Sequence, residues 1–424
     1  MFPKFINIRQ HHKTRPEIKD IPQAVRDTVN KCGADMSGLS GKTVGIAVGS
    51  RGIKNIDIIV KSTVDEVRHA GGTPVVFAAM GSHGGGTADG QREVLAALGV
   101  TEESIGCKIR TGIESVYYGI GANGTEVFAN PIALEFDKII LINRIKMHTD
   151  FEDVTESGIY KLMAVGLGNP KGAGIIHACS HTVGYGEAIR NAGNVILNKL
   201  PVLFALAVTE NWKHETDSIE AILPDNLLET EKRILKEVKA GAIALPLRVF
   251  DILIIEQAGK QFSGTTVDTK VVGMIRISGE KEPEFPKIKN IAVLDFTKEY
   301  HGNAMGLGIV DIISRRAYDN INITDTSLTG VTSTCLDQAK IPCVAPDDRT
   351  AIETCFRACG ITEPESAEIM LIRNTSELEY MAVSMNAYEK LKENDDIEAI
   401  GAFYELEFDI NGRMIDPLSD NNLK

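Results

Sequence analysis

Short apolar runs alternate with amphipathic segments along most of the chain. The runs are rich in Val, Ile and Leu, a pattern typical of parallel strands that are buried on both faces. We expect strands at residues 43–48, 73–80, 138–142, 202–208, 250–255, 290–294 and 368–372. Segments between them are expected to be helical, at residues 58–70, 90–98 and 229–240. This alternation predicts right-handed βαβ units, and therefore an α/β fold with mostly parallel sheets.

The length of 424 residues predicts two α/β domains with an active-site cleft between them. A helical segment with a polar face, at residues 230–242, is followed by a new strand that begins at Phe250. We therefore predict an N-terminal domain over residues 1–245 and a C-terminal domain over residues 246–424. The polar tail after Asp409 is expected to be poorly ordered.

The composition indicates which partners the protein can bind and in which cellular compartment it is found. Lys and Arg number 45 against 58 Asp and Glu, which gives a net charge of −13. A surface that follows nucleic-acid phosphates needs an excess of cations, so we expect no nucleic-acid partner. The seven cysteines are scattered without a CxxC pair, which indicates reduced thiols in a cytoplasmic protein. The N-terminus lacks the layout of a signal peptide, and the longest apolar run, at residues 201–208, is too short to span a membrane.

Reactive side chains follow four of the expected strands. Arg51 follows the first strand, His83 the second and His148 the third. Gln257 and Lys260 follow the strand that opens the C-terminal domain. Ligands of open parallel sheets bind beyond the carboxyl ends of the strands, so we expect these residues to face one site. Two cations, two imidazoles and an amide describe a pocket for a small organic anion, with acid and base groups beside it.

Two glycine-rich stretches have both a functional and a structural interpretation. The run Gly84–Gly86 either brings bare backbone close to a phosphate or carboxylate, or forms a tight turn from strand to helix. The stretch from His148 to His181 contains Lys161, His177 and several glycines, and such a loop is costly to order without a ligand. His177 and His181 are four residues apart, a spacing that allows both to bind one metal ion from one face of a helix. The alternative is the start of a helix with one exposed histidine. Without a third ligand motif, a zinc hydrolase is disfavoured.

The order and spacing of these residues resemble those of the nickel-dependent lactate racemase family, whose members are isomerases that use a nickel-pincer nucleotide. The resemblance extends from about residue 40 to about residue 265 in motif order, and more loosely to the end of the chain. It rests on the series Arg51, His83, His148, Lys161, His177 and Gln257-x-x-Lys260. Its most specific parts are the pair Lys161 and His177, which are 16 residues apart, and the Gln257-x-x-Lys260 unit.

The resemblance implies a cofactor that four residues hold. In the family a lysine carries the nickel-pincer nucleotide through a covalent thioamide, and the matching residue is Lys161. The later histidine is a ligand of nickel, and the matching residue is His177. Gln257 and Lys260 are implied to contact the cofactor as well. Because other proteins make and load this nucleotide, cofactor-synthesis proteins are implied as partners.

The implied reaction is racemisation or epimerisation of a small 2-hydroxy acid, by reversible hydride transfer through a 2-keto acid. The α-hydrogen beside a carboxylate is poorly acidic, and no side chain can accept it as a hydride, so an electron-poor cofactor is needed. His83 and His148 are implied to be the general acid and base, one for each face of the substrate. Arg51 and Lys260 are implied to hold the substrate carboxylate.

The chain departs from the family pattern and resembles a divergent member. Val48 stands where the family has an aspartate, and Gly158-Ile159-Tyr160 replaces a Gly-Gly-Arg sequence before the lysine. Two other functions therefore stay open. One is a lyase or aldolase in which Lys161 forms a Schiff base with a carbonyl substrate. The other is a binding protein that keeps the fold without turnover.

Overall fold

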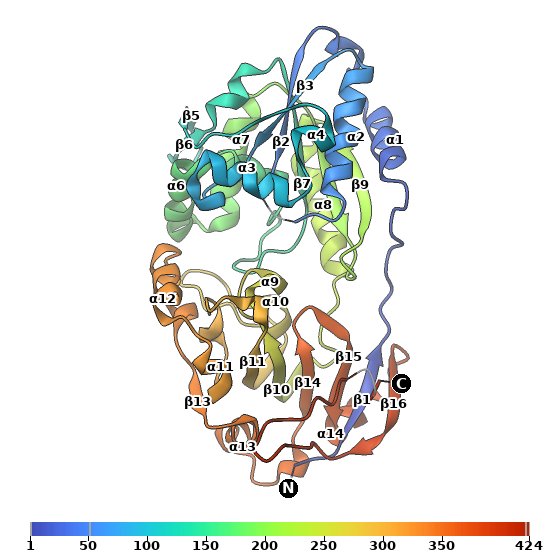
Figure 1. Cartoon of the computed structure of the whole chain (residues 1–424), viewed down its shortest axis with the longest axis vertical. Coiled ribbons are helices and arrows are strands. Elements are labelled where there is room, and N and C mark those ends of the chain that lie inside the picture. The colour runs from blue at the N-terminus through green and yellow to red at the C-terminus, as the bar shows by residue number, and fades with distance from the viewer. Residues whose placement is uncertain (1, 51, 420–421, 424) are drawn as a thin grey trace. The chain divides into compact units, whose positions relative to one another are not determined.

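The computed structural model divides into two compact units and describes the chain except for residues 1, 51, 420–421 and 424. The N-terminal unit comprises Thr14–Ala242, and the C-terminal unit comprises Ile243–Lys424 together with Met1–Lys13 (Figure 1). The first strand of the chain thus lies in the C-terminal unit, whereas the sequence analysis assigned residues 1–245 to the N-terminal domain. The reason is that this strand pairs with strands near the other end of the chain, and no local pattern signals that pairing.

A six-stranded sheet forms the centre of the N-terminal unit, in the order β4–β3–β2–β7–β8–β9. Its strands are parallel except for β9, which pairs antiparallel with β8 at one edge. The central strands are buried along nearly their whole length, which agrees with their continuous apolar runs. The bounds are β2 (Thr43–Val48), β3 (Thr73–Ala78), β4 (Lys108–Arg110), β7 (Lys138–Arg144), β8 (Val202–Glu210) and β9 (Thr216–Ile222).

Helices cover both faces of this sheet and form two separate cores with it. One core joins α1–α4 to side chains such as Ile46 and Phe204, and the other joins α5–α8 to side chains such as Leu141. The bounds are α1 (Ile21–Cys32), α2 (Ile56–His69), α3 (Ala88–Ala97), α4 (Glu102–Ile105), α5 (Ile159–Lys161), α6 (Asn169–Val183), α7 (Tyr185–Lys199) and α8 (Leu227–Ala240). A ribbon of β5 (Val116–Ile120) and β6 (Glu126–Ala129) lies against α6 and α7.

An eight-stranded mixed sheet forms the centre of the C-terminal unit, in the order β13–β12–β11–β10–β14–β15–β1–β16. The first five strands are parallel, and β15, β1 and β16 continue the sheet as antiparallel strands. The strand bounds are β1 (Phe5–Gln10), β10 (Val249–Ala258), β11 (Lys287–Phe296), β12 (Ile312–Ser314), β13 (Cys343–Ala345), β14 (Ile369–Asn374), β15 (Glu377–Ser384) and β16 (Ile397–Tyr404). The helix bounds are α9 (Lys260–Ser263), α10 (Thr269–Val272), α11 (Arg315–Asp319), α12 (Ile323–Thr332), α13 (Asp348–Ala358) and α14 (Met385–Leu391).

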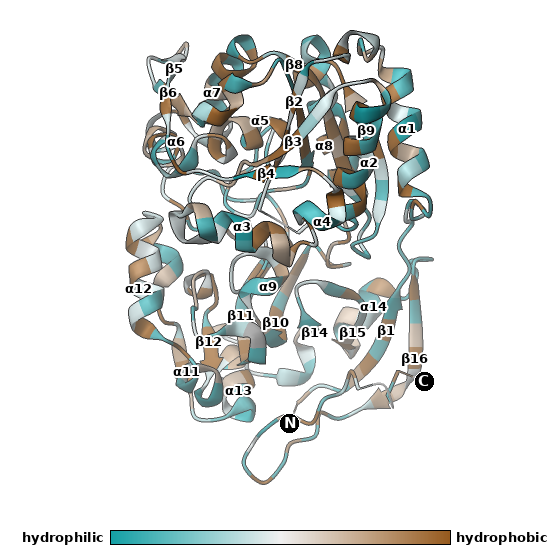
Figure 2. Ribbon diagram, turned by 45° about the horizontal axis from the view of Figure 1, so that its top comes forward, coloured by the Kyte–Doolittle hydropathy of each residue, from teal (hydrophilic) through white to brown (hydrophobic). Residues whose placement is uncertain are grey.

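The predicted fold class, two α/β domains with mostly parallel sheets, is confirmed. Figure 2 shows hydrophobic residues gathered on the central strands, and hydrophilic residues on helices such as α1. The expectation of a poorly ordered tail after Asp409 is wrong for the described part of the tail. Met414 and Leu418 pack into a core with α13, because these two apolar residues find a buried surface among otherwise polar neighbours.

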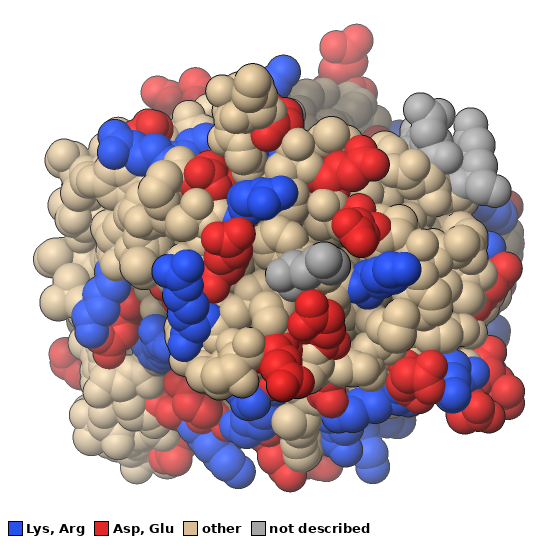
Figure 3. Space-filling view, turned by 90° about the horizontal axis from the view of Figure 1, so that it is seen from below, with Lys and Arg blue, Asp and Glu red and all other residues tan. Residues whose placement is uncertain are grey.

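Acidic and basic side chains are interspersed on the face seen in Figure 3, so the described residues of that face form no large patch of one charge. In the described part of the chain, no helix combines the length and the apolar character that a membrane crossing requires.

Candidate functional site

The strand order of the N-terminal sheet reverses at β2 and β7. From β2 the chain proceeds outward to β3 and β4, and it then returns to the opposite side of β2 at β7. At such a reversal the loops diverge and leave a crevice, where ligands of open α/β sheets bind. Ser50 lies just after β2, His83 lies on the loop after β3, and His148 lies on the loop after β7.

The loop after β7 is closed at its base. The backbones of Lys146 and Ser157 exchange hydrogen bonds of 2.8 and 3.2 Å. The chain therefore returns to the end of β7 before it enters α5, the short helix that ends at Lys161. As a result, Nε2 of His148 contacts Nζ of Lys161.

The hydrogen bonds of His148 determine which ring nitrogen presents a proton to Lys161. Nδ1 of His148 accepts the backbone N–H of Asp150 at 3.0 Å. In a neutral imidazole the proton then resides on Nε2, the nitrogen that contacts Lys161. This N–H donates to the lysine when the lysine is a neutral amine, which is its nucleophilic form. With the lysine neutral, the pair places one imidazole proton beside one amine near the switch point.

A row of ring contacts joins this pair to His177. The ring of His148 stacks on Phe151 with 4.6 Å between centroids, and Phe151 stacks on Tyr185 at 5.3 Å. Tyr185 meets His177 edge to face at 5.7 Å, and its hydroxyl lies 3.3 Å from Nδ1 of His177. Three residues selected separately in the sequence, His148, Lys161 and His177, therefore lie in one connected group of side chains.

His177 lies on α6, four residues before His181, and part of its ring is open to solvent. Desolvation by the surrounding protein lowers the pKa of His177, and the nearby Lys161 lowers it further. A lowered pKa keeps the imidazole neutral, with a lone pair available to a metal ion. No three or more His, Cys, Asp or Glu side chains of the described residues gather into a group that could hold a metal ion. A metal ion at His177 would therefore need further ligands from a bound group.

The backbone between Lys161 and His177 is irregular. Residues Leu162–Gly166 form a π-helical turn directly after α5, and such turns often occur at functional sites. The carbonyl oxygen of Gly166 accepts the backbone N–H of Gly81 at 2.9 Å. This bond joins the segment after Lys161 to the loop that carries His83.

His83 is exposed on its loop, and its Nδ1 contacts Oγ of Ser50. The glycine run after it forms a tight turn in which all three φ angles are positive, at 68°, 64° and 64°. Gly84 is required there, because a Cβ would lie 2.5 Å from the backbone of Gly90 at the start of α3. The geometry of the run therefore fits the structural interpretation, a turn into α3 that also sets the position of His83.

Three further residues were predicted for the site: Arg51, Gln257 and Lys260. Arg51 lies outside the described residues. Gln257 and Lys260 belong to the C-terminal unit, at the carboxyl end of β10, where the order of that sheet reverses between β10 and β14. Nζ of Lys260 donates to Oδ1 of Asn303 at 3.2 Å, so the glycine-rich stretch after β11 supplies a neighbour to this lysine.

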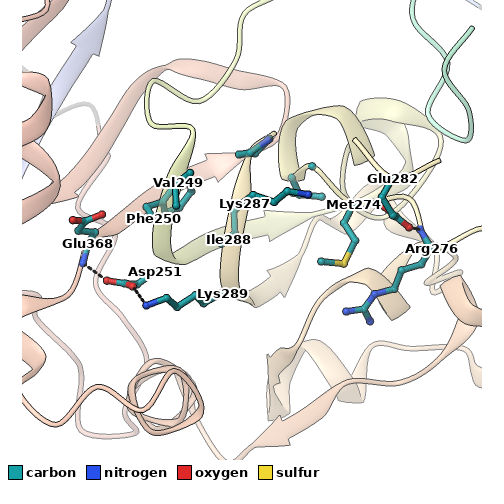
Figure 4. A pocket seen from close by; sticks show the side chains of 13 residues that line it. Val249, Phe250, Asp251, Met274, Arg276, Glu282, Lys287, Ile288, Lys289 and Glu368 are labelled. Carbon is teal, nitrogen blue, oxygen red and sulfur yellow. Dashed lines mark hydrogen bonds and ion pairs between the residues drawn. The ribbon is translucent and has the colours of Figure 1, made fainter. Parts of the chain in front are cut away.

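A cavity of about 580 Å³ opens at the amino ends of β10 and β11 in the C-terminal unit (Figure 4). Two of its lining side chains pair with each other: Lys289 forms an ion pair with Asp251 at 2.7 Å. The backbone N–H of Glu368 also donates to Asp251, at 2.9 Å. Gln257 and Lys260 lie at the other end of β10, so this cavity is separate from the predicted site residues of the same unit.

Three residues of the candidate site were not predicted: Ser50, Phe151 and Tyr185. Ser50 directly precedes Arg51 after a predicted strand, so its position at a strand end was a signal that could have identified it. Phe151 and Tyr185 belong to no motif. Their contacts with the two histidines depend on how the loop after β7 folds against the start of α7, which no local pattern predicts.

No protein-family model matches the chain, and no curated protein matches it in sequence. Among solved structures, the apoprotein of lactate racemase from Thermoanaerobacterium thermosaccharolyticum is similar, with a TM-score of 0.54. The match covers 87% of this chain and 94% of that chain, at 11% sequence identity. At this identity the similarity is one of fold: the chain has a two-domain α/β architecture like that of this enzyme.

Proposed function

We propose that the protein is an isomerase that racemises or epimerises a 2-hydroxy acid, with a nickel-pincer nucleotide attached at Lys161. The observation that carries this proposal is the contact of Lys161 with His148, together with the link through Phe151 and Tyr185 to His177. The group contains three residues to which the family resemblance assigns roles: Lys161 for attachment, His148 as one of the two acid/base residues and His177 as the metal ligand. The similarity of fold to lactate racemase supports the same conclusion.

The side chains fit this cofactor. Lys161 offers an amine for the covalent thioamide, and His177 offers a neutral imidazole, a ligand that suits nickel. A pincer nucleotide brings donor atoms of its own to the metal, so a single imidazole from the chain is sufficient. When bound, the group supplies a carbon that accepts and returns a hydride. Gln257 and Lys260 are proposed to contact it from the C-terminal unit.

The two histidines are proposed to move the hydroxyl proton of the substrate. His148 exchanges this proton through Nε2, the nitrogen beside Lys161. His83, whose Nδ1 contacts Oγ of Ser50, is proposed to serve the opposite face of the planar keto acid. Arg51 and Lys260 are proposed to hold the carboxylate while the keto acid turns.

Cofactor attachment is tested by intact mass and nickel content after co-expression with cofactor-synthesis proteins. The wild-type chain should gain the added mass on Lys161, together with nickel. Lys161→Ala should gain neither, whereas the control Lys108→Ala, at an exposed position of β4, should gain both. Full added mass on the Lys161→Ala protein would contradict the assignment.

The contact between Lys161 and His148 also favours a second function, a lyase or aldolase that uses a Schiff base. A neutral amine can attack a carbonyl carbon, and the imidazole can move the protons. Treatment with borohydride and a 2-keto acid, together with turnover assays of nickel-free and nickel-loaded protein, separates the two functions. A reduced adduct on Lys161 of the nickel-free protein, with turnover that does not need nickel, favours the lyase. Turnover only in the nickel-loaded protein, without an adduct, favours the isomerase, and ligand binding without turnover in either protein indicates a binding protein.

A further inference from the structure

Helix α8 contacts residues that directly adjoin the Lys161–His148 pair: the start of α5 and the carboxylate that binds the backbone of His148. Two of its side chains, Glu231 and Lys239, lie about two helical turns apart and point to the same loop region. In the sequence, this segment served only to mark the end of the N-terminal domain. Its contacts indicate a different role.

The first contact is made by Glu231, whose side chain is fully buried. Oε2 of Glu231 accepts the backbone N–H of Ile159 at 2.8 Å and that of Tyr160 at 3.2 Å. These two residues begin the turn that ends at Lys161. Gly158 packs directly against the carboxyl group, because a Cβ there would lie 2.3 Å from Oε1. The Gly158-Ile159-Tyr160 sequence, which stands in place of the family's Gly-Gly-Arg, therefore packs against this carboxyl group.

Burial of the Glu231 carboxyl group has a large desolvation cost. Its other oxygen, Oε1, has no hydrogen-bond partner among the described residues, and none of them forms an ion pair with the group. An unpaired buried carboxyl group destabilises a fold, since desolvation is only partly offset by the two backbone donors. Because Glu231 lowers the stability of the fold yet holds the turn before Lys161, its retention indicates that the position of this turn matters for function.

The second contact is made by Lys239 through Glu156. Nζ of Lys239 forms an ion pair with Oε1 of Glu156 at 2.6 Å, and Glu156 is fully buried. Oε2 of Glu156 accepts the backbone N–H of His148 at 2.6 Å. Lys239 therefore holds the backbone of His148 by way of one carboxylate.

We propose that α8 is the element that positions the reactive pair, with Glu231 setting the place of Lys161 and Lys239 setting that of His148. Both are positioning residues, and neither is proposed to touch substrate. The inference rests on the proposed function in one respect, that Lys161 is the residue to which the cofactor is attached. It concerns the unloaded chain, so its test does not need the cofactor.

The test is trace labelling of lysines with acetic anhydride on the full chain without cofactor, read by peptide mass spectrometry from about pH 5 to about pH 9. Imidazoles titrate near pH 6.5, so labelling of Lys161 should show an inflection in that range, which the exposed reference amine Lys108 lacks. His148→Ala should abolish the inflection. Asp150, Glu156 and His177 are titratable groups close to the pair, and all three are unchanged in every variant.

Glu231→Ala and Lys239→Met should each abolish the inflection and change the Lys161 to Lys108 labelling ratio by about tenfold, the worth of one hydrogen bond to a charged group. Glu231→Gln should keep the wild-type profile, because its amide oxygen can accept the same two N–H groups. Lys236→Ala, at an exposed position of the same helix, is the matched control and should also keep it.

If Glu231→Ala does not fold by circular dichroism, Glu231→Asp replaces it, since the shorter side chain withdraws the carboxyl group from the turn. A wild-type profile in folded Glu231→Ala or Glu231→Asp, and in Lys239→Met, would overturn the role of α8. That result would leave the isomerase proposal standing. Conversely, a chain that never loads cofactor would refute the isomerase proposal without altering the labelling result.

Discussion

Replacing Glu231 by glutamine should stabilise the N-terminal unit at alkaline pH and leave it almost unchanged at acid pH. Burial raises the pKa of Glu231 to about 7, although the backbone donors of Ile159 and Tyr160 work in the opposite direction. Because the folded-state pKa lies above the ordinary value of 4.5, ionisation favours the unfolded chain. The penalty is absent below pH 4.5, grows as the pH rises, and is complete above about pH 7.

The expected size follows from the two pKa values. Each pH unit between them corresponds to ~1.36 kcal/mol, so the wild type loses about 3 kcal/mol at pH 8 and roughly 1 kcal/mol at pH 5. Glutamine resembles the protonated acid: its oxygen accepts the same two N–H groups, and its amide nitrogen occupies the place of Oε1. Glu231→Gln should therefore be more stable than the wild type by about these amounts.

Urea unfolding measures the difference, with fluorescence of Trp212 as the probe. Trp212 is the single tryptophan of the sequence and lies in the N-terminal unit, so its signal reports on the unit that contains Glu231. Glu229→Gln, at an exposed position of the same helix, is the control and should show no comparable dependence on pH. A stability difference between Glu231→Gln and wild type that stays constant from pH 5 to pH 8 would refute the reasoning.

Three further outcomes are expected. His83→Ala and His148→Ala should each lower kcat of the loaded enzyme by roughly 10²–10⁴-fold, the usual worth of a general acid or base, and a change below about tenfold would exclude that role. In heavy water the product should retain the α-hydrogen of the substrate by NMR, because a hydride does not exchange with solvent; complete deuterium incorporation at initial rate would rule out hydride transfer. Gly158→Ala should lower the stability of the N-terminal unit by about 1–3 kcal/mol, since its Cβ would lie 2.3 Å from Oε1 of Glu231, and Glu231→Ala should remove most of that loss if this contact is the cause.

The parallel strands were predictable because they are buried on both faces, and this leaves a continuous apolar run in the sequence. The first predicted strand, 43–48, has the observed bounds of β2. Strands with one solvated face, or with only three residues, leave no such run. The edge strand β9 mixes buried and half-buried positions, and β12 is too short for any periodicity to be visible.

The site was predictable only as far as it depends on strand ends and spacing. His83 and His148 were found because the carboxyl ends of parallel strands share one edge. The aromatic link through Tyr185 and the buried carboxyl group of Glu231 depend on contacts between segments distant in sequence. In the sequence, Glu231 looks like any acidic residue of a polar-faced helix, and only the packing of α8 against α5 shows that it is buried.

The placement of β1 has a consequence for synthesis of the chain. β1 is synthesised before the residues of the N-terminal unit, whereas both strands that flank it, β15 and β16, are synthesised after them. The contiguous residues Thr14–Ala242 can fold as a unit while β1 still waits with both of its backbone edges exposed. Such a strand is a template for pairing with other chains, so this interval is when the nascent protein is most prone to aggregate. A fragment of the N-terminal unit that begins at residue 14 omits this unpartnered strand, whereas one that includes β1 would carry it permanently.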